Sequence, residues 1–149
     1  MNTKDCLYNK CQEFIADRLH TIQYAISENQ KALHSETKSS AGDKHETGRA
    51  MLQLEMEKAG QQLSGILQMK ETIAKINPSK SSDIAHLGSI IFTSNVNYFI
   101  AISAGKIVVD SKEYFAVSPS SPVGKVLLGK RKGALISFNN MDIEIINVM

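Results

Sequence analysis

The stretch Asn77-Pro78-Ser79-Lys80-Ser81-Ser82 divides the sequence into two regions whose apolar residues repeat with different periods. Proline cannot continue a helix and biases the residue before it towards extended backbone, and the serines that follow are typical of a linker. A chain of 149 residues is long enough for two small domains. We therefore expect one domain over residues 1–78 and a second over residues 79–149.

On the N-terminal side of this linker, apolar residues recur at steps of three and four, which places them on one face of a helix. This spacing predicts one helix from Lys4 to about Ser35 and another from about Glu46 to Ile76. The two apolar stripes are formed, with Asn29 filling one gap, by Cys11, Ile15, Leu19, Ile22, Ile26 and Leu33, and by Leu52, Met56, Ala59, Leu63, Ile66, Met69, Ile73 and Ile76.

Two such helices, joined by a short polar link, bury their stripes best against each other, as an antiparallel coiled-coil hairpin. Each helix would be about 45 Å long at about 1.5 Å per residue. The tip of the hairpin falls at about residues 36–48. Because both stripes are satisfied within one chain, a dimeric coiled coil is disfavoured and we expect a monomer.

On the C-terminal side of the linker, short β-rich runs alternate with turn signals such as Ala104-Gly105, Asp110-Ser-Lys112 and Asn139-Asn140. One short helix interrupts them, with Ser121 as its N-cap, Pro122 as its first residue and Gly129 as its stop. The predicted class is therefore α+β, a helical hairpin followed by a small β-rich domain. The predicted strands are Ser89–Thr93, Val96–Ser103, Lys106–Val109, Tyr114–Val117, Ala134–Phe138 and Asp142–Val148.

The composition is that of a soluble globular protein, with 42% hydrophobic and 21% charged residues and a net charge of +2. No signal peptide opens the chain and no apolar run has the length of a bilayer span, so we expect no membrane association and a cytoplasmic location. The two cysteines, Cys6 and Cys11, point to different sides of one helix, which disfavours a disulfide between them.

Two motifs carry a resemblance to a known family. Ser121-Pro-Val-Gly-Lys-Val-Leu-Leu-Gly-Lys130, followed by Gly133, is very like a Ser-Pro-Leu-Gly-(Lys/Arg)-Ala-Leu-Leu-Gly-Lys…Gly run in the C-terminal domain of the Gre transcription elongation factors (GreA/GreB). Gly42-Asp43-Lys44-His45-Glu46 is similar to the Gly-Asp-x-x-Glu tip of their hairpin. In architecture the chain resembles this family over nearly its whole length.

The resemblance implies an FKBP-like C-terminal domain and a bacterial RNA polymerase as the partner. It implies that Ser120, Ser121 and Pro122 contact the rim of the polymerase secondary channel, while the hairpin reaches towards the active site and the nascent RNA 3′ end. Backtracked RNA would then be cut by the polymerase itself. The chain would therefore be no enzyme but an accessory factor that stimulates hydrolysis.

At the tip, the resemblance implies that Asp43 and Glu46 are the catalytic and metal-binding carboxylates, donated to a magnesium ion shared with the polymerase. Residues three apart at the start of a helix face the same way, and two-metal sites stabilise the attacking and leaving oxygens. The chain would need no cofactor of its own. Lys38, Lys44 and Arg49 are candidates for contact with RNA phosphates.

Each of these motifs also has a purely structural interpretation. Asp43 and Glu46 can cap the second helix, and the lysines and arginine of the tip can be a solvated face. A metal site at His34 and His45 lacks ligand spacing. The run Lys130-Arg131-Lys132 is more typical of an exposed loop than of a nucleic-acid site.

A second functional hypothesis is a Gre-like regulator that binds in the channel and inhibits or tunes transcription without stimulating cleavage. Two departures from the family pattern favour it: Ser120 stands where an acidic residue is common, and Thr47-Gly-Arg-Ala50 replaces acidic and aromatic tip residues. A peptidyl-prolyl isomerase is disfavoured, because such enzymes use an aromatic-lined pocket. The β-rich region has no tryptophan and only a few aromatic residues, several of which are needed for the core.

Overall fold

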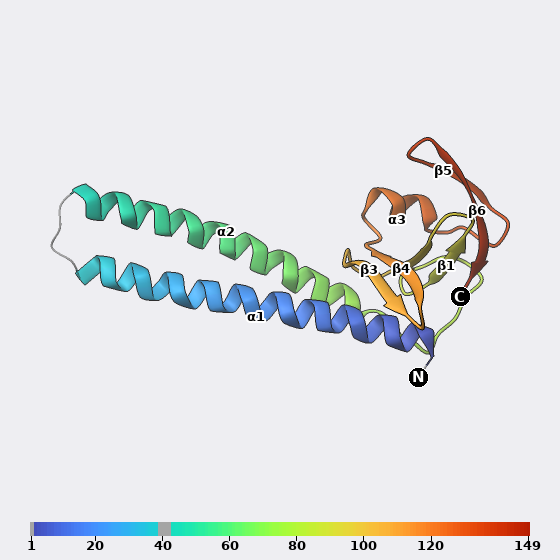
Figure 1. Cartoon of the computed structure of the whole chain (residues 1–149), viewed down its shortest axis with the longest axis horizontal. Helices are drawn as coiled ribbons and strands as arrows, with labels where there is room; N and C mark the ends of the chain where they lie inside the picture. The colour runs from blue at the N-terminus through green and yellow to red at the C-terminus, as the bar shows by residue number, and fades with distance from the viewer. Residues whose placement is uncertain (1, 39–42) are drawn as a thin grey trace. The chain divides into compact units, whose positions relative to one another are not determined.

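The computed structural model describes residues 2–38 and 43–149, and the side chains of residues 36–46 lie outside that description. Two long helices, α1 (Thr3–Lys38) and α2 (Asp43–Ala74), are followed by six strands and a short helix (Figure 1). This order confirms the predicted class, a helical pair followed by a small β-rich domain.

The chain forms two compact units. One combines the start of the chain up to Phe14 with Lys70–Met149, and the other is Ile15–Met69. Both long helices therefore cross from one unit into the other. The division predicted after residue 78 stays a prediction.

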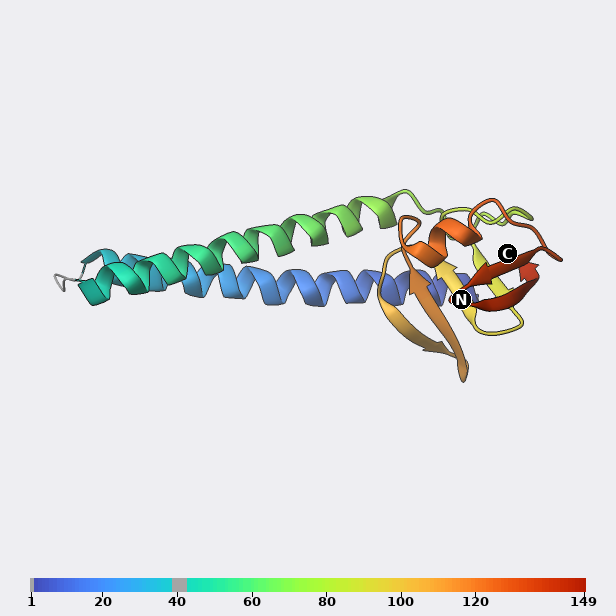
Figure 2. The same ribbon diagram turned by 90° about the horizontal axis from the view of Figure 1, so that it is seen from above.

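In the unit Ile15–Met69, α1 and α2 run antiparallel along each other (Figures 1 and 2). Every residue of the two predicted stripes is buried or half-buried, with Ile22, Ala59 and Ile66 among the most protected. Several large apolar residues off the stripes are exposed, namely Tyr24 at 65%, Met51, Leu54 and Leu67. The spacing of apolar residues thus predicted correctly which face of each helix is covered.

The ends of α2 differ slightly from the prediction. The helix begins at Asp43, three residues before the predicted Glu46, and ends at Ala74. Its last turn tightens, because the N–H groups of Lys75 and Ile76 donate to carbonyls three residues back, at 3.1 Å each. Hydrogen bonds that span three residues, as in a 3₁₀-helix, are common in the last turn of a helix.

The strands form one sheet in the order β3-β4-β2-β1-β6-β5. Neighbouring strands are antiparallel, except that β2 and β4 are parallel. All six predicted strands are present. They are β1 (Ile90–Thr93), β2 (Asn97–Ile100), β3 (Gly105–Val109), β4 (Lys112–Val117), β5 (Leu135–Phe138) and β6 (Met141–Val148).

Strand β2 is shorter than predicted, since it ends at Ile100 rather than at Ser103. Ala101 and Ile102 are buried although they lie beyond the strand, and the Ala101 N–H still donates to the Val117 carbonyl of β4 at 2.8 Å. The pairing of β1 with β6 is irregular at one point. Phe92 of β1 lies opposite Asn147, but the next residue, Thr93, lies opposite Ile145, so the register shifts by one residue in β6.

Two hairpins close with two-residue loops in left-handed backbone. Asp110 and Ser111 join β3 to β4, and Asn139 and Asn140 join β5 to β6, all with positive φ. Such loops match the twist of paired strands, and asparagine and aspartate tolerate this conformation better than most residues. The predicted turns at both places are confirmed.

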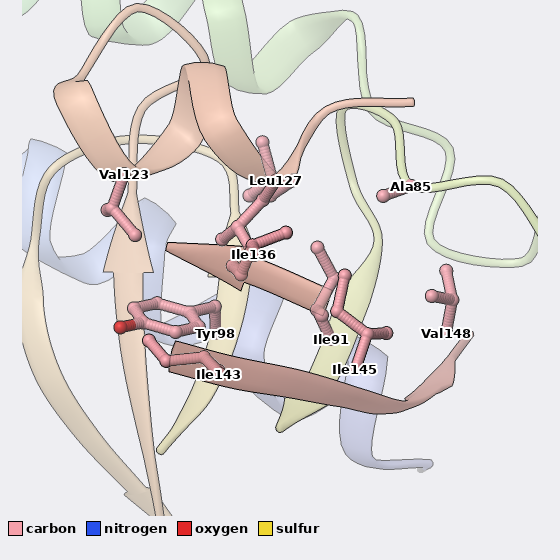
Figure 3. Packing of buried hydrophobic residues seen from close by; sticks show 10 residues of the cluster. Ala85, Ile91, Tyr98, Val123, Leu127, Ile136, Ile143, Ile145 and Val148 are labelled. Atoms are coloured by element: carbon pink, nitrogen blue, oxygen red, sulfur yellow. The ribbon is translucent and has the colours of Figure 1, made fainter. Parts of the chain in front are cut away.

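A cluster of buried side chains fills one face of the sheet and is closed by α3 (Pro122–Leu127). Figure 3 shows Val123 and Leu127 pointing from this helix towards the strands. Burial of such side chains is the main stabilising contribution to a domain of this size. The cluster consists of Ala85, Ile91, Tyr98, Ile100, Val123, Leu127, Ile136, Ile143, Ile145 and Val148.

The opposite face of the sheet is covered by the first turns of α1. Ile90 and Phe99 pair across β1 and β2 and point away from the cluster, because successive side chains alternate between faces. Both are almost fully buried, as are Leu7 and Cys11 of α1. Lys4 forms a hydrogen bond from α1 to the linker, in which its Nζ donates to the Lys80 carbonyl at 2.8 Å. Burial lowers the pKa of the Lys4 ammonium group.

In the described part of the chain, neither long helix has an apolar stretch of the length that a bilayer span requires.

The close approach of α3 to the preceding turn gives a test of packing. A Cβ added at Gly124 would collide with the Ser118 carbonyl oxygen and lie 2.9 Å from Ser121 Oγ. We expect Gly124→Ala to lower the free energy of unfolding by about 1–3 kcal/mol. Urea denaturation followed by tyrosine fluorescence measures it. Gly60→Ala is the control, because open space surrounds Gly60 in α2 and alanine should be neutral or stabilising there. Equal effects of the two substitutions would contradict the packing argument.

The two cysteines give a second test. Both are free thiols; Cys11 is fully buried and Cys6 is half-buried. Burial raises the pKa of Cys11 from 9.0 to about 12. The contribution of this thiol to stability is therefore present below pH 9.0 and lost as the pH rises towards about 12. At pH 8, we expect iodoacetamide to modify Cys6 more than about tenfold faster than Cys11, as peptide mass spectrometry would show. Equal rates in the native protein would argue against the buried position of Cys11.

Candidate functional site

The turn that leads into α3 is the part of the predicted site that the structure describes in full. Ser121 Oγ accepts from the Gly124 N–H at 3.1 Å and donates to the Ser118 carbonyl at 2.7 Å. Ser121 is therefore the N-cap of α3, with Pro122 at the first helical position, as predicted. At the other end, Gly129 has a φ of +80° and follows the last residues of the helix, which confirms the predicted stop.

The Ser121 hydroxyl is thus used by the fold, and the residues on either side of it, Ser120 and Pro122, are exposed. Ser120 Oγ lies 3.2 Å from Ser118 Oγ, and the Ser118 N–H donates to Ser103 Oγ at 3.3 Å. The Ser118 bond joins this turn to the segment that follows β2. The structure thus brings Ser120, Ser121 and Pro122 together in one rigid, accessible turn.

Basic side chains surround the far end of α3. Lys125 on the helix and Lys130, Arg131 and Lys132 in the following loop are all exposed. The loop backbone is fixed at both sides, since the Ala85 N–H donates to the Lys130 carbonyl at 2.8 Å and the Gly133 N–H to the Ile145 carbonyl at 2.7 Å. The exposed loop predicted at residues 130–132 is confirmed. Lys125 was not singled out from the sequence, although its helical spacing from Ser121 could have indicated it.

The tip residues are described only in part. Asp43 and Glu46 lie in the first turn of α2, but their side chains, and those of Lys38, Lys44 and His45, fall outside the described residues. Arg49 and His34 are exposed on α2 and α1. The proposed metal carboxylates and RNA contacts therefore stay predictions.

Within the described residues, no three His, Cys, Asp or Glu side chains gather in an arrangement that could hold a metal ion. A magnesium ion held by the tip alone is not expected in any case, because Mg²⁺ takes near-octahedral oxygen coordination and Asp43 and Glu46 supply only two side-chain carboxylates.

Comparisons with known proteins give structural neighbours only. No family model matches the chain, and no curated protein matches it either. Among solved structures, the GreA factor homolog 1 (Gfh1) protein of Thermus thermophilus is similar, with 18% identity over 92% of this chain and 93% of that chain and a TM-score of 0.37. A second structure, of the transcription factor Gfh1, has 19% identity over 91% of each chain and a TM-score of 0.36.

The serines of the turn separate a structural role from a contact role. Ser121→Ala removes the cap of α3 and should lower the free energy of unfolding by about 1 kcal/mol. Ser120→Ala removes only an exposed hydroxyl and should change it by less than about 0.5 kcal/mol. Chemical denaturation of the two variants beside the wild type measures both values. A larger loss for Ser120→Ala than for Ser121→Ala would show that the capping assignment is wrong.

Proposed function

We propose that this chain is a transcription factor that binds bacterial RNA polymerase through its secondary channel and stimulates cleavage of backtracked RNA. The observation that carries the proposal is where the two Gre-like motifs fall in the fold. One motif opens α2 at Asp43, and the other forms the capped turn at Ser121 that opens α3. Both lie at the beginning of a helix, which is a place where a chain can meet a partner.

The capped turn is the proposed contact with the channel rim. Ser120 and Pro122 are exposed, while Ser121 holds the turn rigid through its bonds to Ser118 and Gly124. A preformed turn loses little conformational entropy when it binds, which favours affinity. The exposed Lys125 and the loop Lys130–Lys132 add positive charge near the same helix and would favour an acidic partner surface.

The beginning of α2 is the proposed catalytic contribution. Asp43 and Glu46 lie one helical turn apart, so the positions share one face of α2. There they would share a magnesium ion with the polymerase, which stabilises the attacking and leaving oxygens of an in-line displacement. The ion belongs to the polymerase complex, so the chain is an accessory factor with no cofactor of its own.

The basic residues of the tip have a matching role in this proposal. Lys38, Lys44 and Arg49 lie at the end of α1 and in the first turns of α2. Their positive charge would attract the phosphates of the extruded RNA 3′ end. The complex would form in the cytoplasm with the chain as a monomer.

A second candidate is a regulator that occupies the channel without promoting cleavage. One described feature favours it: Ser120 is an exposed, uncharged residue whose hydroxyl faces Ser118, so the turn lacks the acidic residue that is common at this position in the Gre family. Binding would then depend more on shape and on the basic residues around α3. The two candidates differ in whether the tip carboxylates matter.

Cleavage of RNA in a stalled, backtracked elongation complex distinguishes them. With the cognate polymerase, we expect the wild-type chain to accelerate release of the RNA 3′ fragment. Asp43→Ala and Glu46→Ala should each abolish most of that acceleration while polymerase binding is retained, because each removes a charge near the reacting phosphate. Gel analysis of the RNA fragments gives the rates, and co-sedimentation gives the binding.

Glu55→Ala and Glu57→Ala are matched controls, because they remove exposed carboxylates from the middle of α2. Both should leave cleavage unchanged. If the wild type binds polymerase but cleavage is not accelerated, the cleavage proposal is wrong and the channel-occupying regulator takes its place. If the wild type does not bind polymerase, both candidates are wrong.

A further inference from the structure

The inference concerns the edge of the sheet at β3, and it does not depend on the proposed function. In the described sheet, strand β3 is an edge strand and pairs only with β4. An edge strand carries backbone N–H and C=O groups that another extended chain can pair with. Natural proteins often cover or shorten such edges, so the surroundings of β3 decide whether it is accessible.

The pairing pattern identifies the outward groups. The loop Asp110-Ser111 has two residues, so Val109 and Lys112 are a hydrogen-bonded pair, and so are Ile107 and Tyr114 two residues further on. The alternation turns the backbone groups of Lys106 and Val108 away from β4. Strand β4 agrees with this assignment, because the Val117 carbonyl accepts from Ala101 at 2.8 Å on the side of β2.

The outer side of β3 borders a hollow instead of a covering element. The hollow has a volume of about 330 Å³ and is lined by Lys10 and Phe14 of α1 and by Ala104, Lys106, Ile107 and Val108. All six residues belong to one compact unit. Figures 1 and 2 both show β3 beside the early turns of α1. A space of this volume beside a strand has room for a few side chains of an added strand.

The lining has the composition of a peptide-binding edge. Phe14 is half-buried, and Val108 is 52% exposed although it is apolar. Strand addition obtains affinity from backbone hydrogen bonds and specificity from pockets that accept alternate side chains. Lys106 and Val108 offer the backbone groups, and Phe14 and Ile107 form the apolar wall of the hollow.

The positive charge of the residues that line the hollow favours an acidic partner. Lys10 and Lys106 are its two charged residues, and both are exposed. Lys106 pairs with Glu113 at 3.3 Å, but both side chains are more than half exposed, so the pair contributes little and can be exchanged. A second copy of the chain is disfavoured as the occupant, because pairing two β3 edges would gather four lysines at one interface. An incoming acidic residue is attracted instead.

We propose that the β3 edge binds an extended, acidic segment of a partner protein by strand addition. The segment would pair its backbone with Lys106 and Val108, place an apolar side chain in the hollow against Phe14, and place carboxylates beside Lys10 and Lys106. This surface is made of different residues from the capped turn at Ser121 and the tip at Asp43.

The test uses the full chain and, as its probe, a library of short random peptides displayed on phage. We expect the enriched peptides to combine Asp or Glu with β-branched residues at alternating positions. One enriched peptide is then titrated in solution. The double variant Lys10→Glu/Lys106→Glu should weaken its binding about tenfold or more, since two attractions become repulsions. The control Lys130→Glu/Lys132→Glu has the same charge change away from the hollow and should alter binding by less than about twofold.

Two further measurements use the wild-type chain, so their results do not depend on variants that could misfold. Methylation of alternate peptide nitrogens should abolish binding to the wild type, because it removes backbone donors. Amide NMR shifts should appear at Lys106 and Val108 and not at Leu135 and Ser137 on the opposite edge strand β5. No enrichment, enrichment of basic peptides, tolerance of methylation or shifts confined to β5 would each overturn the proposal. Self-association of the chain through β3 would overturn it as well.

Discussion

Burial of the central strand from both sides is the constraint on which the sheet domain depends. Phe99 and Ile100 are neighbours in β2, point to opposite faces and are both fully buried. A strand with this pattern needs a cover on each face. The cover on one face is α3, and on the other it is the first part of α1, which the sequence places far from the strands. The domain is thus completed by residues from both ends of the sequence.

This arrangement determines what the candidate site can do. Val123 and Leu127 fix α3 against the sheet, and the same packing fixes the turn that precedes the helix. The cap at Ser121 and the close approach at Gly124 leave that turn little freedom. Exposed residues on a rigid support bind with a small loss of entropy. The hollow beside β3 has the same origin, because α1 covers the face of the sheet but leaves its edge open.

Local chemistry could be predicted from the sequence, and long-range arrangement could not. The conformational preferences of single residues predict the short helix, which has Ser121 and Pro122 at its start and Gly129 at its stop. The same kind of preference predicts the two-residue turn at Asn139-Asn140. The helical stripes followed from periodicity alone. By contrast, nothing local indicates that β2 and β4 pair in parallel or that Lys4 is buried near Lys80. These depend on which distant elements meet. For the site, the capping role of Ser121 was predictable and the helical spacing of Lys125 from Ser121 could have indicated Lys125, whereas the open β3 edge appears only in three dimensions.

The cover that α1 provides for the sheet also bears on how the chain folds during synthesis. The first turns of α1 are synthesised well before β6, the strand that pairs with β1. At about 5–20 residues per second, Leu7 and Cys11 wait on the order of ten seconds for the sheet they cover. The helical unit Ile15–Met69 can form before the sheet is complete, because its contacts are mostly local. The apolar start of α1 is therefore exposed to chaperones and to other chains for longer than the rest of the helix.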